Sequence, residues 1–174
     1  MADILLTHSY HFPYDRKQVR KMQPYPPLGT LYAAALLQKS GFSVALFDSM
    51  LENPEHGFPA ALERHRPKLV AIYEDNFNFL SKMCLSRMRD VAFGMIDATE
   101  VYGARVVVNG SDASDHARDY LERGADYVLL GEAEITLLEV VESLAGGTGA
   151  DAAEIPGVVC RSGAIYWSEL GLDP

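Results

Sequence analysis

Five short apolar runs alternate along the chain with longer segments of helical periodicity. The runs occupy residues 4–6, 42–47, 69–73, 105–108 and 126–130. The third run is almost continuously hydrophobic, which is typical of a strand buried on both faces of a parallel sheet. The connections are long enough for right-handed βαβ crossovers. The alternation predicts an α/β fold with a doubly wound five-stranded parallel sheet, flavodoxin-like or Rossmann-like, in the order 2-1-3-4-5.

The connecting segments carry the signals of amphipathic helices. Pro27 suits the first turn of a helix that Gly41 ends. Helices are also predicted over 58–65, 80–102 and 112–123, the last with Asp112 in a capping arrangement. The expected buried stripes are Leu28, Leu31, Tyr32, Ala35 and Leu36 after Pro27, then Met88, Val91, Ala92, Met95, Ile96 and Thr99, and in the final helix Ile135, Leu138, Val141 and Ala145.

The chain changes character after the final helix. A glycine-rich stretch, 146–149, indicates a domain edge. Val158–Cys160 and Ala164–Trp167 then read as the two strands of a β-hairpin. We therefore divide the chain into an α/β domain over 1–147 and a linker with the hairpin over 148–174.

Composition fits one globular domain and excludes several partners. The 174 residues are 48% hydrophobic and 22% charged, enough to bury a core. The net charge is −9 and the densest basic stretch, Arg16–Lys21, is short, so no nucleic-acid surface is expected. No apolar run approaches the ~20 residues of a membrane span and no secretion signal opens the chain, which predicts a cytoplasmic protein. Cys84 and Cys160 predict neither a disulfide framework nor a metal site.

Polar, turn-rich stretches follow each predicted strand. Because ligands of open parallel sheets bind beyond the carboxyl ends of the strands, these stretches should meet at one rim. The first loop, 7–23, contains no glycine, so a dinucleotide site of the G-x-G-x-x-G type is disfavoured. The stretches are Thr7 to Tyr10, Asp48, Glu74 to Asn78, Asn109 to Asp112 and Gly131 to Thr136.

The junction after the fifth strand is the most informative of these stretches. Gly131 allows close approach of backbone or ligand, and Glu132 and Glu134 open a helix. Carboxylates suit the positive end of the helix dipole, so the two acids are explained equally well by helix stability and by a ligand site.

Four segments resemble one family in the right order and spacing. Residues 26–34 with 41–44 are similar to its "PPLGLLYLAAxLxxxGHxV" opening, and Asp48 fits its second strand end. Residues 106–112 are a diverged form of "vvxGGPHat", 126–136 match "DyvvxGEgExT", and the segment from Ile155 is similar to an "IpGlxyrxxG" hairpin. The chain thus resembles the N-terminal cobalamin (vitamin B12)-binding domain of the cobalamin-dependent radical S-adenosylmethionine (SAM) enzymes.

This resemblance implies a function. The rim would hold cobalamin, its nucleotide tail running into the sheet and its corrin face presented to a radical SAM barrel that carries S-adenosylmethionine and a [4Fe-4S] cluster. The chain has no CxxxCxxC cluster motif, so we expect it to be non-catalytic alone and the full-length protein to perform methyl transfer or related radical chemistry. A D-x-H-x-x-G motif is absent as well, which predicts cobalamin without a protein histidine on cobalt.

The resemblance also implies a set of cofactor-binding residues. Gly110 and Gly131 would permit close approach, Ser111 and Thr136 would donate hydrogen bonds, and Leu28 would form an apolar wall. The full set is Thr7, His8, Ser9, Leu28, Asp48, Asn76, Asn109, Gly110, Ser111, Asp112, Gly131, Glu132, Glu134 and Thr136.

Three other functions share this fold class. A phospho-acceptor receiver could use Asp75, but no lysine follows the fifth strand. A flavin mononucleotide module would use hydroxyls after the first strand, with which Thr7 and Ser9 are compatible. A cofactor-free interaction or substrate-gating domain is the third, and the aromatic residues Phe77 and Phe79 leave room for it.

Overall fold

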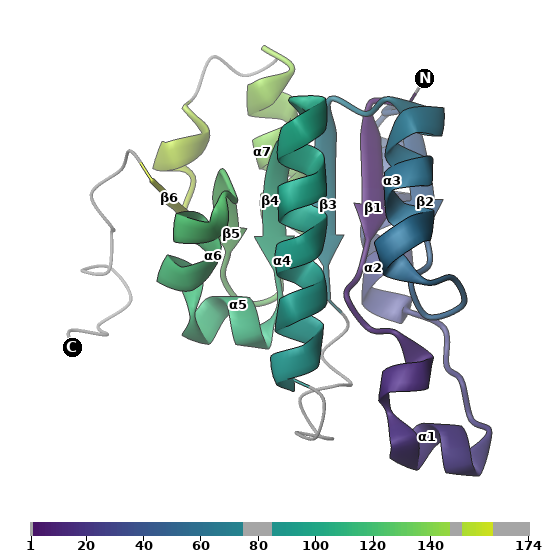
Figure 1. Cartoon of the computed structure of the whole chain (residues 1–174). Coiled ribbons are helices and arrows are strands. Elements are labelled where there is room, and N and C mark those ends of the chain that lie inside the picture. The colour runs from purple at the N-terminus through teal and green to yellow at the C-terminus, as the bar shows by residue number, and fades with distance from the viewer. Residues whose placement is uncertain (1, 75–84, 147–150, 162–174) are drawn as a thin grey trace.

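The computed structural model describes residues 2–74, 85–146 and 151–161, and its centre is one six-stranded sheet (Figure 1). The strand order is β2-β1-β3-β4-β5-β6. The first five strands are parallel, which confirms the predicted order, and β6 is added antiparallel to β5. The strands are β1 Ile4–Thr7, β2 Val44–Phe47, β3 Leu69–Tyr73, β4 Arg105–Asn109, β5 Tyr127–Leu129 and β6 Val158–Cys160.

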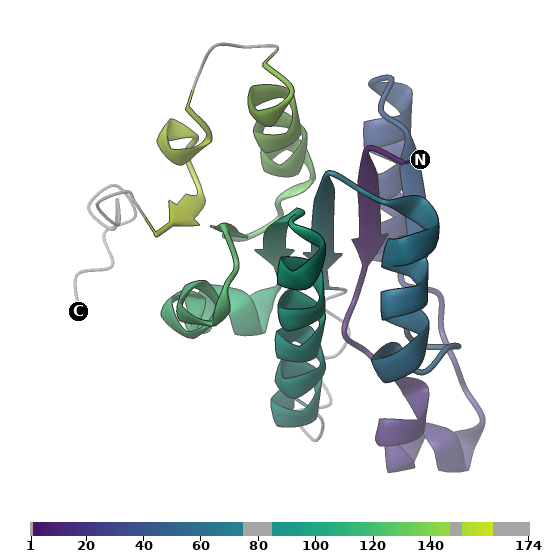
Figure 2. The same ribbon diagram turned by 45° about the horizontal axis from the view of Figure 1, so that its top comes forward.

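Helices cover both faces of the sheet, which makes three layers (Figures 1 and 2). One face packs against α2 (Leu28–Lys39), α7 (Glu134–Leu144) and the short η3 (Ala152–Glu154). The other packs against α3 (Pro54–His65), α4 (Leu85–Tyr102), α5 (Ser111–Asp115) and α6 (Ala117–Arg123). Side chains alternate between the two cores along each strand, so Leu69, Ala71 and Tyr73 face α2 and α7 while Val70 and Ile72 face α3 and α4.

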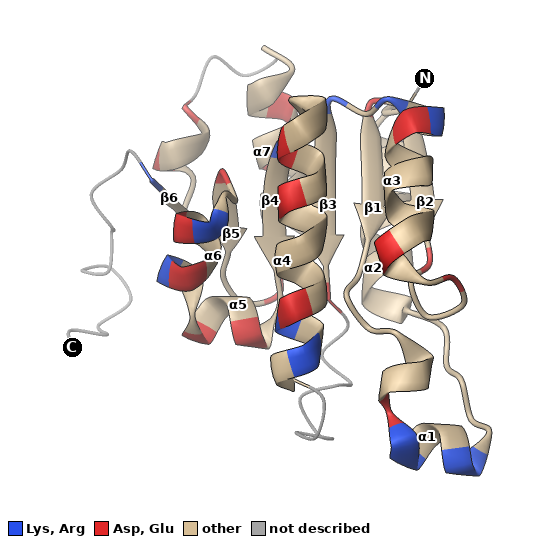
Figure 3. Ribbon diagram, in the orientation of Figure 1, with Lys and Arg blue, Asp and Glu red and all other residues tan. Residues whose placement is uncertain are grey.

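The loop after β1 forms η1 (Phe12–Tyr14) and α1 (Arg16–Lys21), beyond the carboxyl edge of the sheet. Asp15 caps α1 by accepting from the backbone amides of Lys17 and Gln18. Four Lys and Arg residues make α1 a basic projection on an acidic molecule (Figure 3).

The helix α2 buries a different face from the one predicted. Leu28, Leu31 and Tyr32 are 53%, 38% and 68% exposed. The buried residues are Thr30, Ala33, Ala34 and Leu37. The helix is apolar on both sides, and the small side chains allow the closer approach to the sheet, where the Thr30 hydroxyl donates to the Tyr73 carbonyl at 2.7 Å.

The helix α7 is also turned relative to its prediction. Of the predicted stripe Val141 is buried, but Ile135 is 61% exposed, Leu138 is half-buried and Ala145 is exposed. Leu137 and Val140 are the other buried residues of the helix. In α4, by contrast, the predicted residues are buried except Val91, which is half-buried. Residues 80–84 of that predicted helix, including Cys84, lie outside the described residues.

Two further helix predictions are corrected at their ends. The α3 helix begins at Pro54 rather than at residue 58, because Asn53 accepts the Glu55 amide at 2.8 Å and caps the first turn. The predicted helix 112–123 is two helices, α5 and α6, separated at His116. Asp112 does not cap either helix, since its carboxylate is bound by side chains from α4 and α6.

The strand β6 is the first strand of the predicted C-terminal hairpin, and the second, 164–167, lies outside the described residues. Arg161 follows β6 and donates from Nε to the Leu121 carbonyl at 2.7 Å. In the described ranges no helix has the length and apolar character that crossing a membrane requires. Within the same ranges no group of three or more His, Cys, Asp or Glu side chains is placed to hold a metal ion.

Candidate functional site

Hydrogen bonds link the carboxyl ends of all five parallel strands. His8 Nε2 lies 3.0 Å from Asp48 Oδ1, and the Ser9 amide donates to Glu74 Oε1 at 2.7 Å. The Glu74 amide donates to the Asn109 carbonyl at 3.0 Å. Asn109 Nδ2 then donates to the carbonyl of Gly131, also at 3.0 Å. These bonds therefore connect six of the predicted rim residues along one edge, namely His8, Ser9, Asp48, Glu74, Asn109 and Gly131.

The first loop is packed into this edge and not open to it. His8 and Ser9 are each 2% exposed, and Thr7 is fully buried. Ser49 is buried beside His8, with Oγ 3.3 Å from His8 Nδ1, and it also donates to the His8 carbonyl. Tyr10 packs against Tyr25, Met50 and Met88. Ser49 is not among the site residues predicted from the sequence, although it directly follows Asp48.

Two carboxylates of the edge are shifted in opposite directions. Burial opposes ionisation of Asp48, but the hydrogen bond and charge of His8 outweigh it and lower the pKa of Asp48. Burial raises the pKa of Glu74, more than the contacts with His8 and Ser9 lower it. The edge thus favours a charged Asp48 and disfavours a charged Glu74.

Gly110, the glycine that directly follows β4, packs closely against Glu74. Gly110 has φ +150°, and a Cβ placed there would lie 2.7 Å from Glu74 Cβ. A side chain at Gly110 would therefore collide with β3's end. Glu74 therefore packs where a side chain of residue 110 would lie, and close approach of a ligand at Gly110 stays a prediction.

Asp112 forms a salt bridge that fixes α5 to α4. Arg89 donates from Nε and Nη2 to the two Asp112 oxygens at 2.8 and 2.6 Å. The Tyr120 hydroxyl donates to the same carboxylate at 2.8 Å. Burial acts against ionisation, but these partners lower the pKa of Asp112. Through these contacts Asp112 holds α5 against α4 and α6, which is a structural role.

The interior beneath the edge, between α2 and α7, contains Tyr73 and Asn109. The two residues are paired neighbours on β3 and β4, and both are 3% exposed. The Tyr73 hydroxyl accepts the Ala133 amide at 3.3 Å, and the Glu134 carboxyl lies nearby. Burial, together with the charges of Glu134 and Glu132, raises the pKa of Tyr73. From the sequence, Tyr73 is predicted only as the last residue of a buried strand. A hydroxyl-bearing side chain at a strand end is nevertheless typical of a residue that hydrogen-bonds at the edge of the sheet.

The junction after β5 is the open part of the edge. Gly131 has φ +70°, and among the residues that the structure describes no atom beyond its chain neighbours lies within 4 Å of where a Cβ would lie. Gly131 and Glu132 are exposed, and Ser111 and Thr136 are half-buried. Leu28, the predicted apolar wall, is exposed at the start of α2. Asn76 lies outside the described residues.

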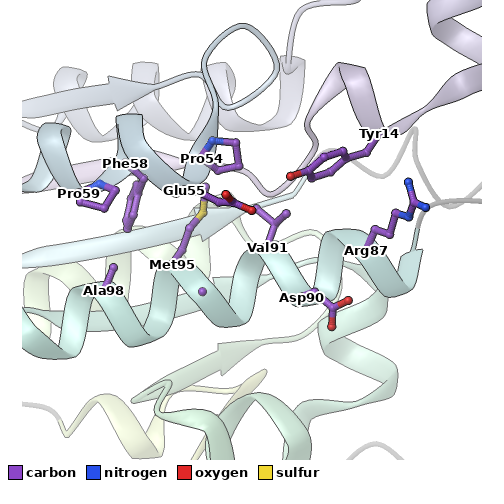
Figure 4. Close-up of a pocket in the computed structure, with 11 residues that line it drawn as sticks. Tyr14, Pro54, Glu55, Phe58, Pro59, Arg87, Asp90, Val91, Met95 and Ala98 are labelled. Carbon is purple, nitrogen blue, oxygen red and sulfur yellow. The ribbon is translucent and has the colours of Figure 1, made fainter.

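Two large hollows of the described surface lie away from this junction. A groove of about 520 Å³ runs between α3 and α4, with Phe58 and Met95 at its floor and Glu55, Arg87 and Asp90 along its sides (Figure 4). A second, of about 610 Å³, lies at the opposite edge of the sheet, beside Asp3, Lys68 and Arg105. Neither includes the junction at Gly131.

The family model of the B12-binding domain matches residues 22–141, which include β2 to β5 and the Gly131 junction. The chain belongs to the B12-binding domain family. No curated protein matches the chain.

Solved structures give the same fold for this B12-binding domain. The cobalamin-dependent S-adenosylmethionine radical enzyme OxsB, with aqua-cobalamin and S-adenosylmethionine bound, superimposes with a TM-score of 0.66 at 16% identity. Its apo form gives 0.66 at 18% identity. Each match covers 95% of this chain and 22% of the OxsB chain. The domain thus spans about a fifth of the length of that relative.

The edge fits one part of cobalamin and not the other. A corrin ring carries amide side chains, which suit the hydroxyls of Ser111 and Thr136, the open backbone at Gly131 and the carboxylate of Glu132. A nucleotide tail that ran into the sheet from this junction would meet Tyr73 in the interior beneath. The residues present therefore suit the ring of the cofactor and do not suit an inserted tail.

Proposed function

We propose that this chain is the corrinoid-binding domain of a cobalamin-dependent radical SAM enzyme and that it holds the corrin ring over the Gly131 junction. The B12-binding family match over 22–141 carries this proposal. When bound, the corrinoid supplies methyl or electron transfer at its cobalt. The residues of the chain bind and orient the ring, and a radical SAM barrel in the same polypeptide supplies S-adenosylmethionine and the [4Fe-4S] cluster.

The ring is held by groups at the exposed edge. Ser111 and Thr136 offer hydroxyls from the first turns of α5 and α7. Gly131 leaves its backbone accessible, since in the described part of the chain only its own neighbours lie within 4 Å of a Cβ placed there. The exposed Leu28 supplies apolar contact at the start of α2. These groups hold the macrocycle noncovalently.

We further infer that no histidine of this chain coordinates the cobalt. His8 is buried, and its two ring nitrogens face Asp48 and Ser49. His11 Nδ1 lies 2.7 Å from the Ser49 carbonyl. With cob(II)inamide, which has no benzimidazole of its own, the electron paramagnetic resonance spectrum of the complex is expected to lack nitrogen splitting. Splitting from a single nitrogen would overturn this inference.

The test of corrinoid binding is a titration of the purified chain with hydroxocobalamin. We expect a shifted corrin absorption spectrum and corrin that co-elutes with the protein after dialysis at tens of micromolar. Loss of all corrin on dialysis would contradict the proposal. A parallel titration with flavin mononucleotide examines the alternative cofactor, and retained flavin in place of corrin would favour it.

Matched variants locate the ring. Ser111→Ala combined with Thr136→Ala removes two hydroxyls, so corrinoid affinity should fall roughly tenfold, at about 1 kcal/mol or less for each hydrogen bond. Ser40→Ala, at the exposed end of α2 on the opposite edge of the sheet, is the control and should leave the affinity unchanged. Equal effects of the two changes would place the ring elsewhere.

A cofactor-free docking domain is the second candidate, favoured by the exposed apolar face of α2. Leu28, Leu31 and Tyr32 form that face. A folded chain that retains neither corrinoid nor flavin is the expected result under this function.

A further inference from the structure

We infer that Tyr73 determines which part of a corrinoid this domain holds: it excludes the nucleotide tail from the interior between α2 and α7, so that only the ring is bound. This inference rests on the proposed corrinoid function. It depends on the contacts of one buried side chain at the end of β3.

Tyr73 fills the route that leads inward from the open junction. Its side chain belongs to the core that α2 and α7 share, with Ala33, Ala34 and Leu137 among its members. Its hydroxyl accepts the Ala133 amide at the start of α7, at 3.3 Å. The amide at the start of α7, which could otherwise bind a phosphate of the tail, therefore already has a partner.

Neighbouring bonds hold Tyr73 in this position. The Thr30 hydroxyl of α2 donates to the Tyr73 carbonyl at 2.7 Å. Asn109, the paired residue on β4, donates to the carbonyls of both Leu129 and Gly131 at 3.0 Å. The Thr30 side chain thus joins α2 to the backbone of β3, while the side chains of Tyr73 and Asn109 bond to the start of α7 and the end of β5. A tail could enter only if this set of bonds were broken.

The acids of the junction support the same interpretation. Glu134 and Glu132 both lie close enough to the Tyr73 hydroxyl for their negative charges to act on it. A tail phosphate in the same place would meet two carboxylates of like charge. The charges, like the packing, favour Tyr73 over a nucleotide.

Comparison of two corrinoids tests the inference. Hydroxocobalamin carries the nucleotide tail and diaquacobinamide lacks it. The full chain is expected to bind both with affinities within about threefold of each other, measured by visible absorption and equilibrium dialysis. Binding of cobalamin more than about tenfold tighter than cobinamide would overturn the inference while leaving the proposed function standing.

Variants of Tyr73 separate the effect of volume from that of the hydroxyl. Tyr73→Ala opens the interior and should raise the affinity for cobalamin about tenfold relative to cobinamide. Tyr73→Leu opens less space at a smaller cost in packing and should give an intermediate ratio. Tyr73→Phe keeps the ring and should leave the ratio as in the native chain. The control is Tyr102→Ala, an exposed tyrosine at the far end of α4, which should also leave the ratio unchanged.

The outcomes for the two proposals differ. If the native chain binds neither corrinoid but Tyr73→Ala binds cobalamin, the proposed function fails and the exclusion by Tyr73 stands. If Tyr73→Ala and Tyr73→Leu fold and keep the native ratio, the exclusion fails. If no form of the chain binds either corrinoid, both proposals fall.

Discussion

Asn109 joins two strand ends with a single amide. Its Nδ2 donates to the carbonyls of Leu129 and Gly131, and its side chain is buried. A carboxamide supplies two hydrogens on one nitrogen, so one residue satisfies both carbonyls. The residue that replaces a glycine of the family's turn therefore completes the fold at the edge where a ligand was expected.

Replacing Asn109 should destabilise the domain measurably. Asn109→Ala removes the donor to the buried Leu129 carbonyl and to the partly buried Gly131 carbonyl, and we expect a loss of about 1–3 kcal/mol in the free energy of unfolding. Asn109→Asp should cost more, because it places an acceptor against two acceptors. Urea unfolding at pH 7 measures both, with Ser111→Ala as a control expected within about 0.5 kcal/mol of the native chain. A native-like value for Asn109→Ala would contradict the assigned bonds.

Asp48 and Glu74 should give the stability opposite dependences on pH. The folded-state pKa of Asp48 is lowered, so its stabilisation is complete above the ordinary value of 3.8 and is lost as the pH falls through the lowered pKa. The pKa of Glu74 is raised, so its carboxylate costs stability above that raised pKa and no longer does so below the ordinary value of 4.5.

Two isosteric variants test these signs. Asp48→Asn should lower the free energy of unfolding at pH 7, with the deficit shrinking below about pH 4 as the native carboxylate is protonated. Glu74→Gln should raise the free energy of unfolding at pH 8, with the gain shrinking toward pH 4.5. Urea titrations across this range measure both, and the same sign for the two variants at pH 8 would disprove the assignment.

Among the elements, α2 is the helix in which hydrophobic periodicity does not decide which face is buried. Two apolar faces run along this helix, and both satisfy helical spacing. Large residues such as Leu31 made one face the stronger prediction, but Ala33 and Ala34 bring the helix closer to the sheet. The choice depends on the fit to β1 and β3, which spacing within one helix does not contain.

Paired truncations on α2 test the face that the structure buries. Leu37→Ala should cost about 2–5 kcal/mol, because Leu37 is fully buried against the sheet. Leu31→Ala, on the opposite face, should cost less than about 1 kcal/mol. Chemical denaturation measures the free energy of unfolding of both variants. A larger loss for Leu31→Ala than for Leu37→Ala would favour the face predicted from the sequence.

At the scale of the whole molecule, the sheet order, its α/β class and the meeting of polar residues at one edge could all be predicted from the sequence. These depend on the order of apolar runs along the chain, which is a local property. Which parts of this edge are open and which are filled by side chains of the fold could not be predicted. Tyr73 reads as the last residue of a buried strand until its hydroxyl is found on the amide of Ala133, 60 positions away.

The sixth strand should contribute to the stability of the whole sheet. Val158, Val159 and Cys160 are all buried against β5 and its neighbours. A chain shortened to residues 1–146 exposes β5 as an unprotected edge, so we expect a loss of about 3 kcal/mol or more and concentration-dependent aggregation. Urea unfolding and light scattering measure this against a chain shortened to residues 1–161. Equal stability of the two would make the segment after residue 147 a separate unit, as the division at that residue predicts.

The reversed direction of β6 determines where the chain leaves the sheet. Cys160 pairs with Tyr127, the first residue of β5, so Arg161 emerges at the edge opposite the Gly131 junction. If a domain follows in the sequence and acts at that junction, the connection to it has to span the height of the sheet. Four or five strand residues correspond to roughly 13–17 Å. A connection shortened by deletions could become too short to span this height. The shortest connection that still functions would then be set by the height of the sheet and not by how tightly the two domains bind each other.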